Sequence, residues 1–313
     1  MQHSIVFLDR GTLGARMRTP NFRHTYREYA VTRGSEVVER LKDVTIAIIN
    51  KVPMPRETLA QLPKLQLIAV AATGTDIIDK DHCRTTGIAV VNIRNYALNT
   101  VPEHVFALIF ALRRSLIAYR EDVRQGVWQR ADQFCFFPHP IRDIAGSTLG
   151  IVGFGALGKS VARRAEAFGM RVLATDIAAQ PGLVDLITLL KGSDIVTLHV
   201  PLTAQTRGMI GAEQLAMMRS GSILINTARG GLVDEQALAA ALRGGVIAGA
   251  GFDVLSSEPP KEGNVLLDAD LPNFILTPHI AWASQEAMQI LADQLVDNIE
   301  AFVAGRPQNV VSE

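Results

Sequence analysis

Three side chains of complementary chemistry stand at or just beyond the ends of apolar runs in the second half of the chain. Arg229, Glu258 and His279 each follow residues that read as a β-strand. An arginine presents a planar, two-pronged donor to a carboxylate or a polarised carbonyl group, and a histidine can transfer a proton near neutral pH. A glutamate beside the histidine would orient its ring and favour its charged form. The combination predicts a site that binds a small anion and protonates its carbonyl group.

The positions of these residues matter because ligands of open α/β sheets bind beyond the carboxyl ends of the strands. Taken singly, each residue has a simpler interpretation. Arg229 would be a surface arginine, Glu258 a solvated loop acid, and His279 a structural histidine pinned by Pro278. The occurrence of all three at strand ends favours one shared site over three unrelated ones.

A second pattern, residues 148–176, predicts what binds beside that site. It reads as a strand, a turn containing Gly153, Gly155 and Gly158, a helix, a second strand, and the acid Asp176. In a dinucleotide site such glycines allow the tight turn, the close approach of a pyrophosphate and the packing of the helix on the sheet, and the helix N-terminus faces the phosphates. The acid falls near the expected distance of about 20 residues. The pattern therefore predicts a dinucleotide-binding βαβ unit, and the alternative is an ordinary βαβ turn without a ligand.

Asp176 also bears on the choice of cofactor. Its carboxylate would accept hydrogen bonds from a ribose 2′-hydroxyl and would repel a 2′-phosphate. The residues that follow it, Ile177, Ala178 and Ala179, include no arginine or lysine that could bind such a phosphate. NAD(H) is therefore favoured over NADP(H).

The elements that must position these residues alternate between strands and helices. Apolar runs without alternation, separated by helices, predict parallel sheets covered on both faces. Strands are expected at 4–9, 44–50, 65–72 and 88–92, then at 148–152, 171–175, 194–200, 222–228, 248–254 and 273–279. Helices are expected at 35–43, 57–63 and 77–87, as one long helix at about 101–120 opened by a capping box at Thr100, and at about 284–304. This order predicts an α/β protein of two doubly wound parallel-sheet lobes, one inserted into the other.

Bulk composition excludes several classes of protein. The 313 residues carry 31 basic and 31 acidic side chains, so no net field would attract nucleic acid or an anionic membrane. The chain has only two cysteines, and they are far apart, which argues against a disulfide framework and a zinc site. No cluster of His, Asp and Glu residues has the spacing of metal ligands either. The N-terminus reads as a strand and not as a signal peptide, and the apolar run 105–112 is too short to span a bilayer. A cytoplasmic protein without nucleic-acid or membrane partners is expected.

The chain resembles the D-isomer-specific 2-hydroxyacid dehydrogenase family, in particular its glycerate dehydrogenase and hydroxypyruvate/glyoxylate reductase branch. The resemblance spans most of the chain and is carried by the stretches 69–79, 146–162, 199–210, 223–238, 250–259 and 276–284. It implies a Rossmann NAD-binding domain, residues 99–284, inserted into a flavodoxin-like substrate domain, residues 1–98 plus 285–313. It also implies hydride transfer between NAD(H) and a small D-2-hydroxy acid/2-keto acid pair, with glyoxylate or hydroxypyruvate as the keto acid.

The resemblance assigns roles to individual residues. It implies Arg229 as the substrate-orienting residue, His279 as the acid/base, and Glu258 as the partner that raises the basicity of the histidine. The substrate-binding residues that it implies are Thr73, Gly74 and Thr75, through their N–H groups, together with Arg229 and Trp282. The cofactor-binding residues that it implies are Thr100, Gly153, Gly155, Ala156, Leu157, Gly158, Asp176, His199, Pro201, Thr206, Thr227, Ala228, Arg229, Asp253 and His279. Of these, Asp253 is expected near the nicotinamide carboxamide.

Other features refine this reading or leave it open. The run 50–53 and Trp282 favour the glycerate/hydroxypyruvate branch, although Trp282 also has a reading as core packing. The segment 177–193 is shorter than usual, so a third strand of the cofactor lobe is expected to be trimmed. An aromatic-rich stretch, 121–145, is expected to be an arm that packs on a second subunit of a homodimer or within its own chain. A different substrate (3-phosphoglycerate, phosphite or a bulkier 2-keto acid) and an NAD(H)-sensing corepressor-like protein remain the alternatives.

Overall fold

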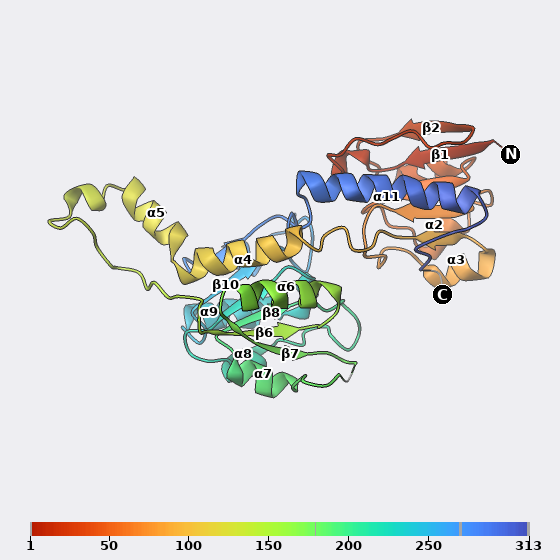
Figure 1. Ribbon diagram of the computed structural model, residues 1–313. Helices are drawn as coiled ribbons and strands as arrows, with labels where there is room; N and C mark the ends of the chain where they lie inside the picture. Colours follow the sequence, from red (N-terminus) through yellow and green to blue (C-terminus); the bar gives the residue numbers. More distant parts are fainter. Residues whose placement is uncertain (1, 179, 269–270, 312–313) are drawn as a thin grey trace. The chain divides into compact units, whose positions relative to one another are not determined.

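The computed structural model describes residues 2–178, 180–268 and 271–311, so that Ala179, which the cofactor argument used, lies outside the described residues. The chain divides into two compact units. The first contains residues 1–96 and 283–313, and the second contains residues 97–282. Each unit is built on one parallel sheet with helices packed on it (Figure 1). The α/β class predicted from the sequence is confirmed.

The first unit contains a five-stranded sheet in the order β2-β1-β3-β4-β5, the order of the flavodoxin-like doubly wound fold. Its strands are β1 (His3–Phe7), β2 (His24–Glu28), β3 (Ile46–Ile49), β4 (Leu67–Val70) and β5 (Ala89–Val91). Its α-helices are α1 (Val37–Leu41), α2 (Arg56–Leu59), α3 (Lys80–Thr86) and α11 (Gln285–Val303). The last of these brings the C-terminal part of the chain back onto β4 of this sheet.

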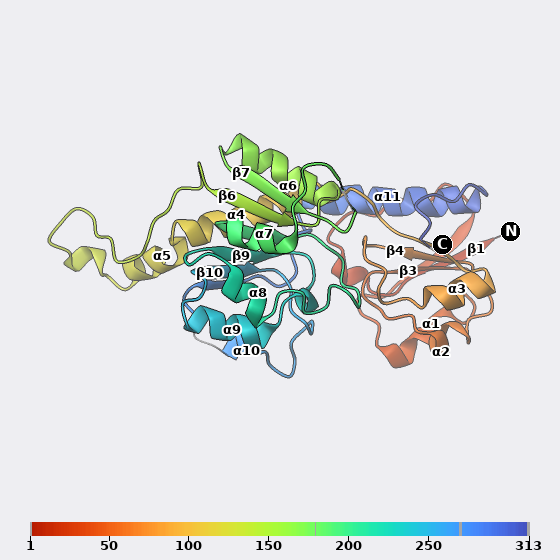
Figure 2. The ribbon, with the colours of Figure 1, turned by 90° about the horizontal axis from the view of Figure 1, so that it is seen from below.

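The second unit contains a six-stranded sheet in the order β11-β10-β9-β8-β6-β7. Its strands are β6 (Thr148–Val152), β7 (Arg171–Thr175), β8 (Ile195–Leu198), β9 (Ile223–Asn226), β10 (Gly249–Phe252) and β11 (Phe274–Leu276). Its α-helices are α4 (Thr100–Arg113), α5 (Leu116–Arg124), α6 (Ala156–Ala167), α7 (Leu186–Gly192), α8 (Ala212–Met217), α9 (Glu235–Arg243) and α10 (Val265–Asp268). Figure 2 shows helices on both sides of this sheet. The strand order reverses between β6 and β8, which is where doubly wound sheets bind ligands.

The segment between β7 and β8 is short, as its sequence predicts. Among the described residues it forms α7 and no strand, so β7 is the outer strand of the sheet. The N–H of Val184 donates to the carbonyl of Ala174 at 2.9 Å on that outer edge. The chain thus makes one backbone hydrogen bond to β7, at Val184, and then enters α7.

The prediction of a single helix at 101–120 is wrong. The chain forms α4 and α5 with a break at Ser115, whose φ of +50° is left-handed. The Ser115 hydroxyl donates to the carbonyl of Pro140 at 2.7 Å, so the break lies where the chain returns from the arm. The capping box at Thr100 is also wrong, because Asn99 is the N-cap residue and the Thr100 hydroxyl donates to Ala281 at 3.1 Å.

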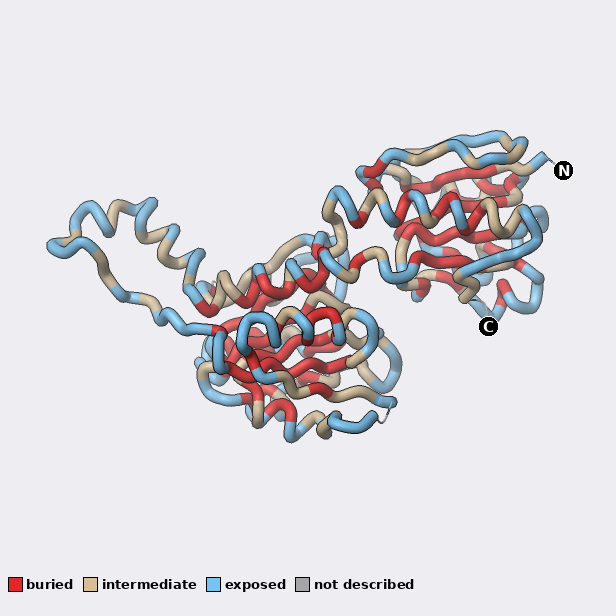
Figure 3. The backbone as a smooth tube through the Cα atoms, in the orientation of Figure 1, coloured by how far each residue is buried: buried red, intermediate tan, exposed pale blue. Residues whose placement is uncertain are grey.

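Each sheet lies in its own hydrophobic core. Figure 3 shows the inner strands of both sheets as buried, the edge strand β2 as mostly exposed, and most helices as buried on one side. All four residues of β3, β4, β8, β9 and β10 are buried, which explains why they read as continuous apolar runs. None of the described helices is both long enough and apolar enough to cross a membrane.

Candidate active site

The glycine turn after β6 has the geometry that a dinucleotide requires. Gly153 has a φ of +99°, and a Cβ there would lie 2.6 Å from the carbonyl oxygen of His199. A Cβ on Gly158 would lie 2.0 Å from the carbonyl oxygen of Gly153. A Cβ on Gly155 would meet no atom of the described residues within 4 Å, so none of these residues fills the space at the start of α6. Two glycines are thus needed for packing, and the third leaves room for a ligand.

The start of α6 also leaves donors available for an anion. Gly155 is the N-cap residue, and no side chain in the described part of the chain caps the helix. The first N–H groups of the helix, at Ala156 and Leu157, therefore face the space beside Gly155, where the helix dipole favours a phosphate. Asp176 directly follows β7, and its carboxylate accepts the N–H of Phe154 at 2.6 Å and that of Ala178 at 3.2 Å. These residues fit a pyrophosphate at the helix and a ribose at the acid.

The end of β8 contributes a neutral histidine. Burial lowers the pKa of His199 to about 4, and its Nε2 lies 3.0 Å from the hydroxyl of the buried Thr197. The following turn is closed by the Thr206 hydroxyl, which donates to the carbonyl of Pro201 at 2.7 Å. The three cofactor candidates His199, Pro201 and Thr206 therefore lie in one turn that directly follows β8, next to β6 in the sheet.

Arg229 lies in a tight loop at the end of β9. The side chain of Asn226 is fully buried and holds this loop, accepting the N–H of Ala228 at 3.1 Å and donating to the carbonyl of Arg229 at 2.8 Å. Arg229 Nη1 donates to the carbonyl of Ala228 at 2.8 Å. The Thr227 hydroxyl is buried and has no hydrogen-bond partner among the described residues, so a bound ligand could satisfy it.

Glu258 and His279 form a pair in the loops that follow β10 and β11. His279 Nδ1 lies 2.5 Å from Glu258 Oε2, and the other carboxylate oxygen accepts the N–H of Leu255 at 2.9 Å. Because the carboxylate is the acceptor, Nδ1 carries the proton and Nε2 is left to exchange a proton with a substrate. Trp282 Nε1 donates to the carbonyl of His279 at 2.9 Å, so the tryptophan also fixes the backbone beside the pair.

Asp253 directly follows β10, and its carbonyl accepts the N–H of His279 at 2.8 Å. Its side chain is 1% exposed and accepts the N–H groups of Ile280 at 2.9 Å and Ala281 at 2.8 Å. The Thr277 hydroxyl donates to the same carboxylate at 2.5 Å. The carboxylate of Asp253 is thus committed to the backbone that follows His279, whereas a contact with a nicotinamide carboxamide stays a prediction.

In the first unit, the loop after β4 carries the expected carboxylate-binding residues. The Thr73 hydroxyl donates to the carbonyl of Ile93 at 2.7 Å, and Asn92 donates to the carbonyl of Thr73 at 2.8 Å. The loop after β3 is held by the buried Asp9, which accepts the N–H of Asn50 at 2.9 Å and that of Lys51 at 2.6 Å. Both loops lie at the carboxyl edge of their sheet, and both are fixed by hydrogen bonds.

Sequence reasoning missed three polar residues that form hydrogen bonds around the candidate residues. Asn226, Thr277 and His104 were not among the candidates, although the first two stand beside predicted residues. The signal for Asn226 is a polar residue at the end of an apolar strand in which every residue is buried. His104 gives no comparable signal, because its partner Thr277 lies 173 positions away in the chain.

Comparison with known proteins places this geometry in a family. Residues 106–281 match the model of the D-isomer specific 2-hydroxyacid dehydrogenase NAD binding domain. A glycerate dehydrogenase of Methylorubrum extorquens (strain ATCC 14718 / DSM 1338 / JCM 2805 / NCIMB 9133 / AM1) is 65% identical over 312 residues, which cover 99% of both chains. A hydroxypyruvate reductase of Blautia hydrogenotrophica is 38% identical, with 92% of this chain and 91% of the relative covered.

The solved structures lead to the same family. The D-lactate dehydrogenase from Aquifex aeolicus, solved in complex with NAD and lactic acid, superposes with a TM-score of 0.83 at 29% identity, and 99% of each chain is covered. This structural similarity, the matching family model and the glycerate dehydrogenase relative all indicate the same family. The chain belongs to the D-isomer specific 2-hydroxyacid dehydrogenase family.

Proposed function

We propose that this protein reduces hydroxypyruvate or glyoxylate to the corresponding D-2-hydroxy acid with NADH. As a member of its family, the protein is an oxidoreductase that interconverts a hydroxy acid and a keto acid with a nicotinamide cofactor. The observation that carries the proposal is the Glu258–His279 pair in the same unit as the glycine turn after β6. The names of the relatives, glycerate dehydrogenase and hydroxypyruvate reductase, support this choice of substrate.

Each residue of the site has a distinct task in the proposed reaction. When bound, NADH would supply a hydride for the carbonyl carbon, and the residues of the chain would bind, orient and protonate the keto acid. The Arg229 guanidinium orients the carboxylate and the carbonyl oxygen of the keto acid, and the N–H groups of Thr73, Gly74 and Thr75 bind its carboxylate. The charged ring of His279, with a proton on each nitrogen, gives its Nε2 proton to the carbonyl oxygen and becomes neutral, while the Nδ1–H stays bonded to Glu258, which orients the ring and favours its charged form.

The remaining cofactor and substrate candidates extend the proposal. We infer that Thr100, Gly153, Gly155, Ala156, Leu157, Gly158, Asp176, His199, Pro201, Thr206, Thr227, Ala228, Arg229, Asp253 and His279 contact the cofactor, and that Trp282 contacts the substrate. The carboxylate of Asp176 supports NAD(H) over NADP(H), because it can accept bonds from ribose hydroxyls and would repel a phosphate. The second unit is then the cofactor domain and the first unit the substrate domain of a cytoplasmic enzyme.

The arm between α4 and β6 supports a homodimer as the working form. Figure 1 shows it extending from the second unit. The exposed apolar side chains that it carries are Leu116, Ile117, Val123, Trp128, Phe134, Phe137 and Ile141. A hydrogen bond joins the outgoing and returning segments of the arm, because the Tyr119 hydroxyl donates to the carbonyl of His139 at 2.9 Å. Such exposed apolar surface marks a protein interface, and a second copy of this chain is the proposed partner.

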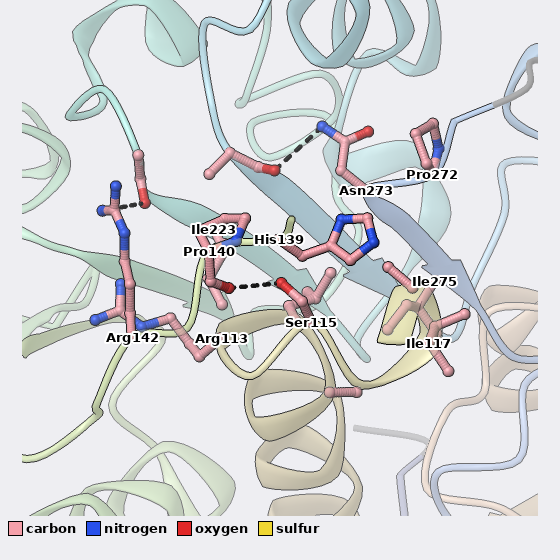
Figure 4. A pocket seen from close by; sticks show the side chains of 15 residues that line it. Arg113, Ser115, Ile117, His139, Pro140, Arg142, Ile223, Pro272, Asn273 and Ile275 are labelled. Carbon is pink, nitrogen blue, oxygen red and sulfur yellow. Dashed lines mark hydrogen bonds between the residues drawn. The ribbon is translucent and has the colours of Figure 1, made fainter. Parts of the chain in front are cut away.

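The root of the arm adds a concave surface to that interface. A cavity of about 330 Å³ lies there between α4, the return of the arm and the starts of β9 and β11 (Figure 4). Ile117, Ile223 and Ile275 line it with apolar surface, and Arg113 and Arg142 line it with charge. Burial and the nearby guanidinium of Arg142 lower the pKa of Arg113. A partner segment that brings apolar side chains and an acid would satisfy this surface.

The proposed reaction is tested by following NADH oxidation at 340 nm with several substrates. The panel contains hydroxypyruvate, glyoxylate, pyruvate, 3-phosphohydroxypyruvate and branched keto acids, with phosphite tested in the direction of NAD reduction and every assay repeated with NADPH. Turnover of hydroxypyruvate or glyoxylate with NADH is expected. Preference for another substrate would refute the substrate assignment, and tight NADH binding without any turnover would favour a sensor.

Substitution of the arginine tests the assigned role within the site. Arg229→Ala should lose most of its activity while the dissociation constant of NADH stays within about twofold, because the proposed contacts of the guanidinium are with the substrate. Arg229→Lys keeps the charge without the planar pair of donors and should recover only part of the loss. An equal loss of activity and NADH binding in a folded Arg229→Ala protein would contradict this assignment.

A further inference from the structure

His104 lies one turn into α4, outside the set of residues so far given a task. Its side chain is 19% exposed, and its Nε2 lies 2.9 Å from the hydroxyl of Thr277. The same nitrogen lies 3.8 Å from Asp253 Oδ1. A helix, the end of β10 and the end of β11 therefore meet at three polar side chains inside the second unit.

The direction of these hydrogen bonds follows from the number of protons. The Thr277 hydroxyl has one proton, and it lies 2.5 Å from Asp253 Oδ1 but 3.4 Å from the carbonyl of Phe252. The proton therefore goes to the carboxylate, and the threonine oxygen is the acceptor toward His104. The ring must then carry a proton on Nε2. The result is a directed chain from His104 to Thr277 to Asp253.

This chain ends on the backbone that positions His279. Asp253 accepts the N–H groups of Ile280 and Ala281, the two residues that follow the histidine. His279 itself has a φ of +56°, a left-handed conformation that a residue other than glycine keeps only when its surroundings hold it there. The N–H of His279 donates to the carbonyl of Asp253 at 2.8 Å. The backbone on both sides of the catalytic ring is thus tied to Asp253.

We propose that His104 is a positioning residue that acts through Thr277 and Asp253 to hold the main chain of His279. This inference rests on the proposed function, in which His279 Nε2 gives a proton to the substrate. Without the Nε2–H of His104, the Thr277 hydroxyl is free to turn toward the carbonyl of Phe252, and Asp253 loses one of its three donors. The main chain at 279–281 then moves more freely, and Nε2 leaves its productive position more often.

Two pairs of variants separate the hydrogen bond from the volume of the side chains. His104→Leu removes the donor and keeps the bulk, whereas His104→Gln keeps a donor. Thr277→Val removes the hydroxyl at almost constant shape, whereas Thr277→Ser keeps it. His24→Leu is the matched control, because His24 is a half-buried histidine of the first unit whose Nδ1 bonds the carbonyl of Phe22 at 2.7 Å.

The first measurement needs neither cofactor nor substrate. Amide hydrogen exchange at Ile280 and Ala281 in the ligand-free protein should accelerate about tenfold or more in His104→Leu and Thr277→Val. His104→Gln, Thr277→Ser and His24→Leu should exchange at close to the rate of the unmodified protein. Unchanged exchange at both amides in His104→Leu and Thr277→Val would overturn the proposal.

The second measurement is the rate. In His104→Leu and Thr277→Val, kcat should fall on the order of 10- to 100-fold, since a displacement of about 1 Å costs up to about 100-fold. The KM for NADH should change less than about twofold, and His104→Gln should recover most of kcat. In the double variant, the two losses should not multiply, because both substitutions break the same chain. Multiplying losses, or a kcat within twofold of the unmodified protein, would overturn the proposal.

The two measurements also distinguish this inference from the proposed function. If the unmodified protein shows no turnover of any keto acid, the proposed function fails, and the amide exchange still decides whether the chain holds residues 280 and 281. If the unmodified protein is active and the variants neither exchange faster nor turn over more slowly, only the role of His104 fails. Should His104→Leu not fold, the comparison of Thr277→Val with Thr277→Ser gives the same decision.

Discussion

The neutral histidine at the end of β8 makes a quantitative prediction about stability and pH. The pKa of His199 falls from 6.5 to about 4 in the folded protein because burial disfavours the charged ring. Between these two values the unfolded chain binds the proton and the folded protein does not. The free energy of unfolding should therefore rise with pH across this window, and stability should be lost as the pH falls from 6.5 toward 4.

The size of the effect follows from the same two values. At about 1.4 kcal/mol for each pKa unit, the full window corresponds to about 3 kcal/mol. At pH 5, where the folded ring is still mostly neutral, the loss relative to pH 7.5 should be about 2 kcal/mol. Other groups also titrate in this range, so the prediction concerns the difference between the unmodified protein and His199→Gln, in which no ring can titrate.

Urea denaturation followed by tryptophan fluorescence is the suitable assay. Both tryptophans, Trp128 and Trp282, belong to the second unit, so the signal reports on the unit that contains His199. Relative to pH 7.5, the free energy of unfolding at pH 5 should fall by about 2 kcal/mol more in the unmodified protein than in His199→Gln. His24→Gln, in the first unit, should leave this pH dependence unchanged. A difference between the unmodified protein and His199→Gln that does not vary with pH would show that the ring is not kept neutral by burial.

Three further predictions concern the cofactor site and the arm. Gly158→Ala should lower the melting temperature sharply, because its Cβ would lie 2.0 Å from a backbone oxygen. Gly155→Ala should melt at the same temperature as the unmodified protein but should lose NADH binding in a fluorescence titration. Asp176→Asn should weaken NADH binding about tenfold or more and should reduce the preference for NADH over NADPH. An unchanged ratio of the NADH and NADPH dissociation constants would refute the role assigned to Asp176. Phe134→Ser combined with Phe137→Ser should convert a dimer to a monomer in light scattering, and a dimer that persists would place the interface elsewhere.

The sequence predicts the buried strands well and the exposed edge poorly. Strands such as β4 and β9 are buried along their whole length, so their apolar runs identify them. The strand β2, with the sequence HTYRE, was not predicted, because four of its five residues are exposed. Its hydrogen bonds to β1 come from the backbone and leave no pattern in the side chains. An edge strand of this kind depends on its neighbour, which a local sequence window does not contain.

The break between α4 and α5 has a similar cause. The apolar pattern continues through Ser115, and a helix to residue 120 is consistent with it. The chain turns there because the Ser115 hydroxyl bonds to Pro140, 25 positions later, when the arm returns. Helical propensity is a weak local preference that tertiary contacts such as this hydrogen bond routinely override.

Some residues of the candidate site could be recognised from the local sequence, whereas others depend on partners far away in the chain. The residue types of Arg229, Glu258 and His279 and their places after strands could be recognised because chemistry and position are both local. The groups that hold them could not be recognised in the same way. Asn226 fixes Arg229 from three positions away, whereas His104 reaches Thr277 across most of the second unit's sequence. The further a supporting residue lies in the chain, the less its type reveals its task.

The two kinds of support at His279 act on different degrees of freedom. Glu258 binds Nδ1 and so fixes the rotation and tautomer of the ring, but it does not determine where the backbone beneath the ring lies. Asp253, bonded by Thr277 and through it by His104, accepts the N–H groups of that backbone. The position of Nε2 requires both, because a correctly rotated ring on a displaced backbone is as unproductive as the reverse. Loss of the Glu258 bond or of the His104 bond displaces the same atom, His279 Nε2. The fold loss of kcat in the double variant Glu258→Gln/His104→Leu should therefore be smaller than the product of the two single losses.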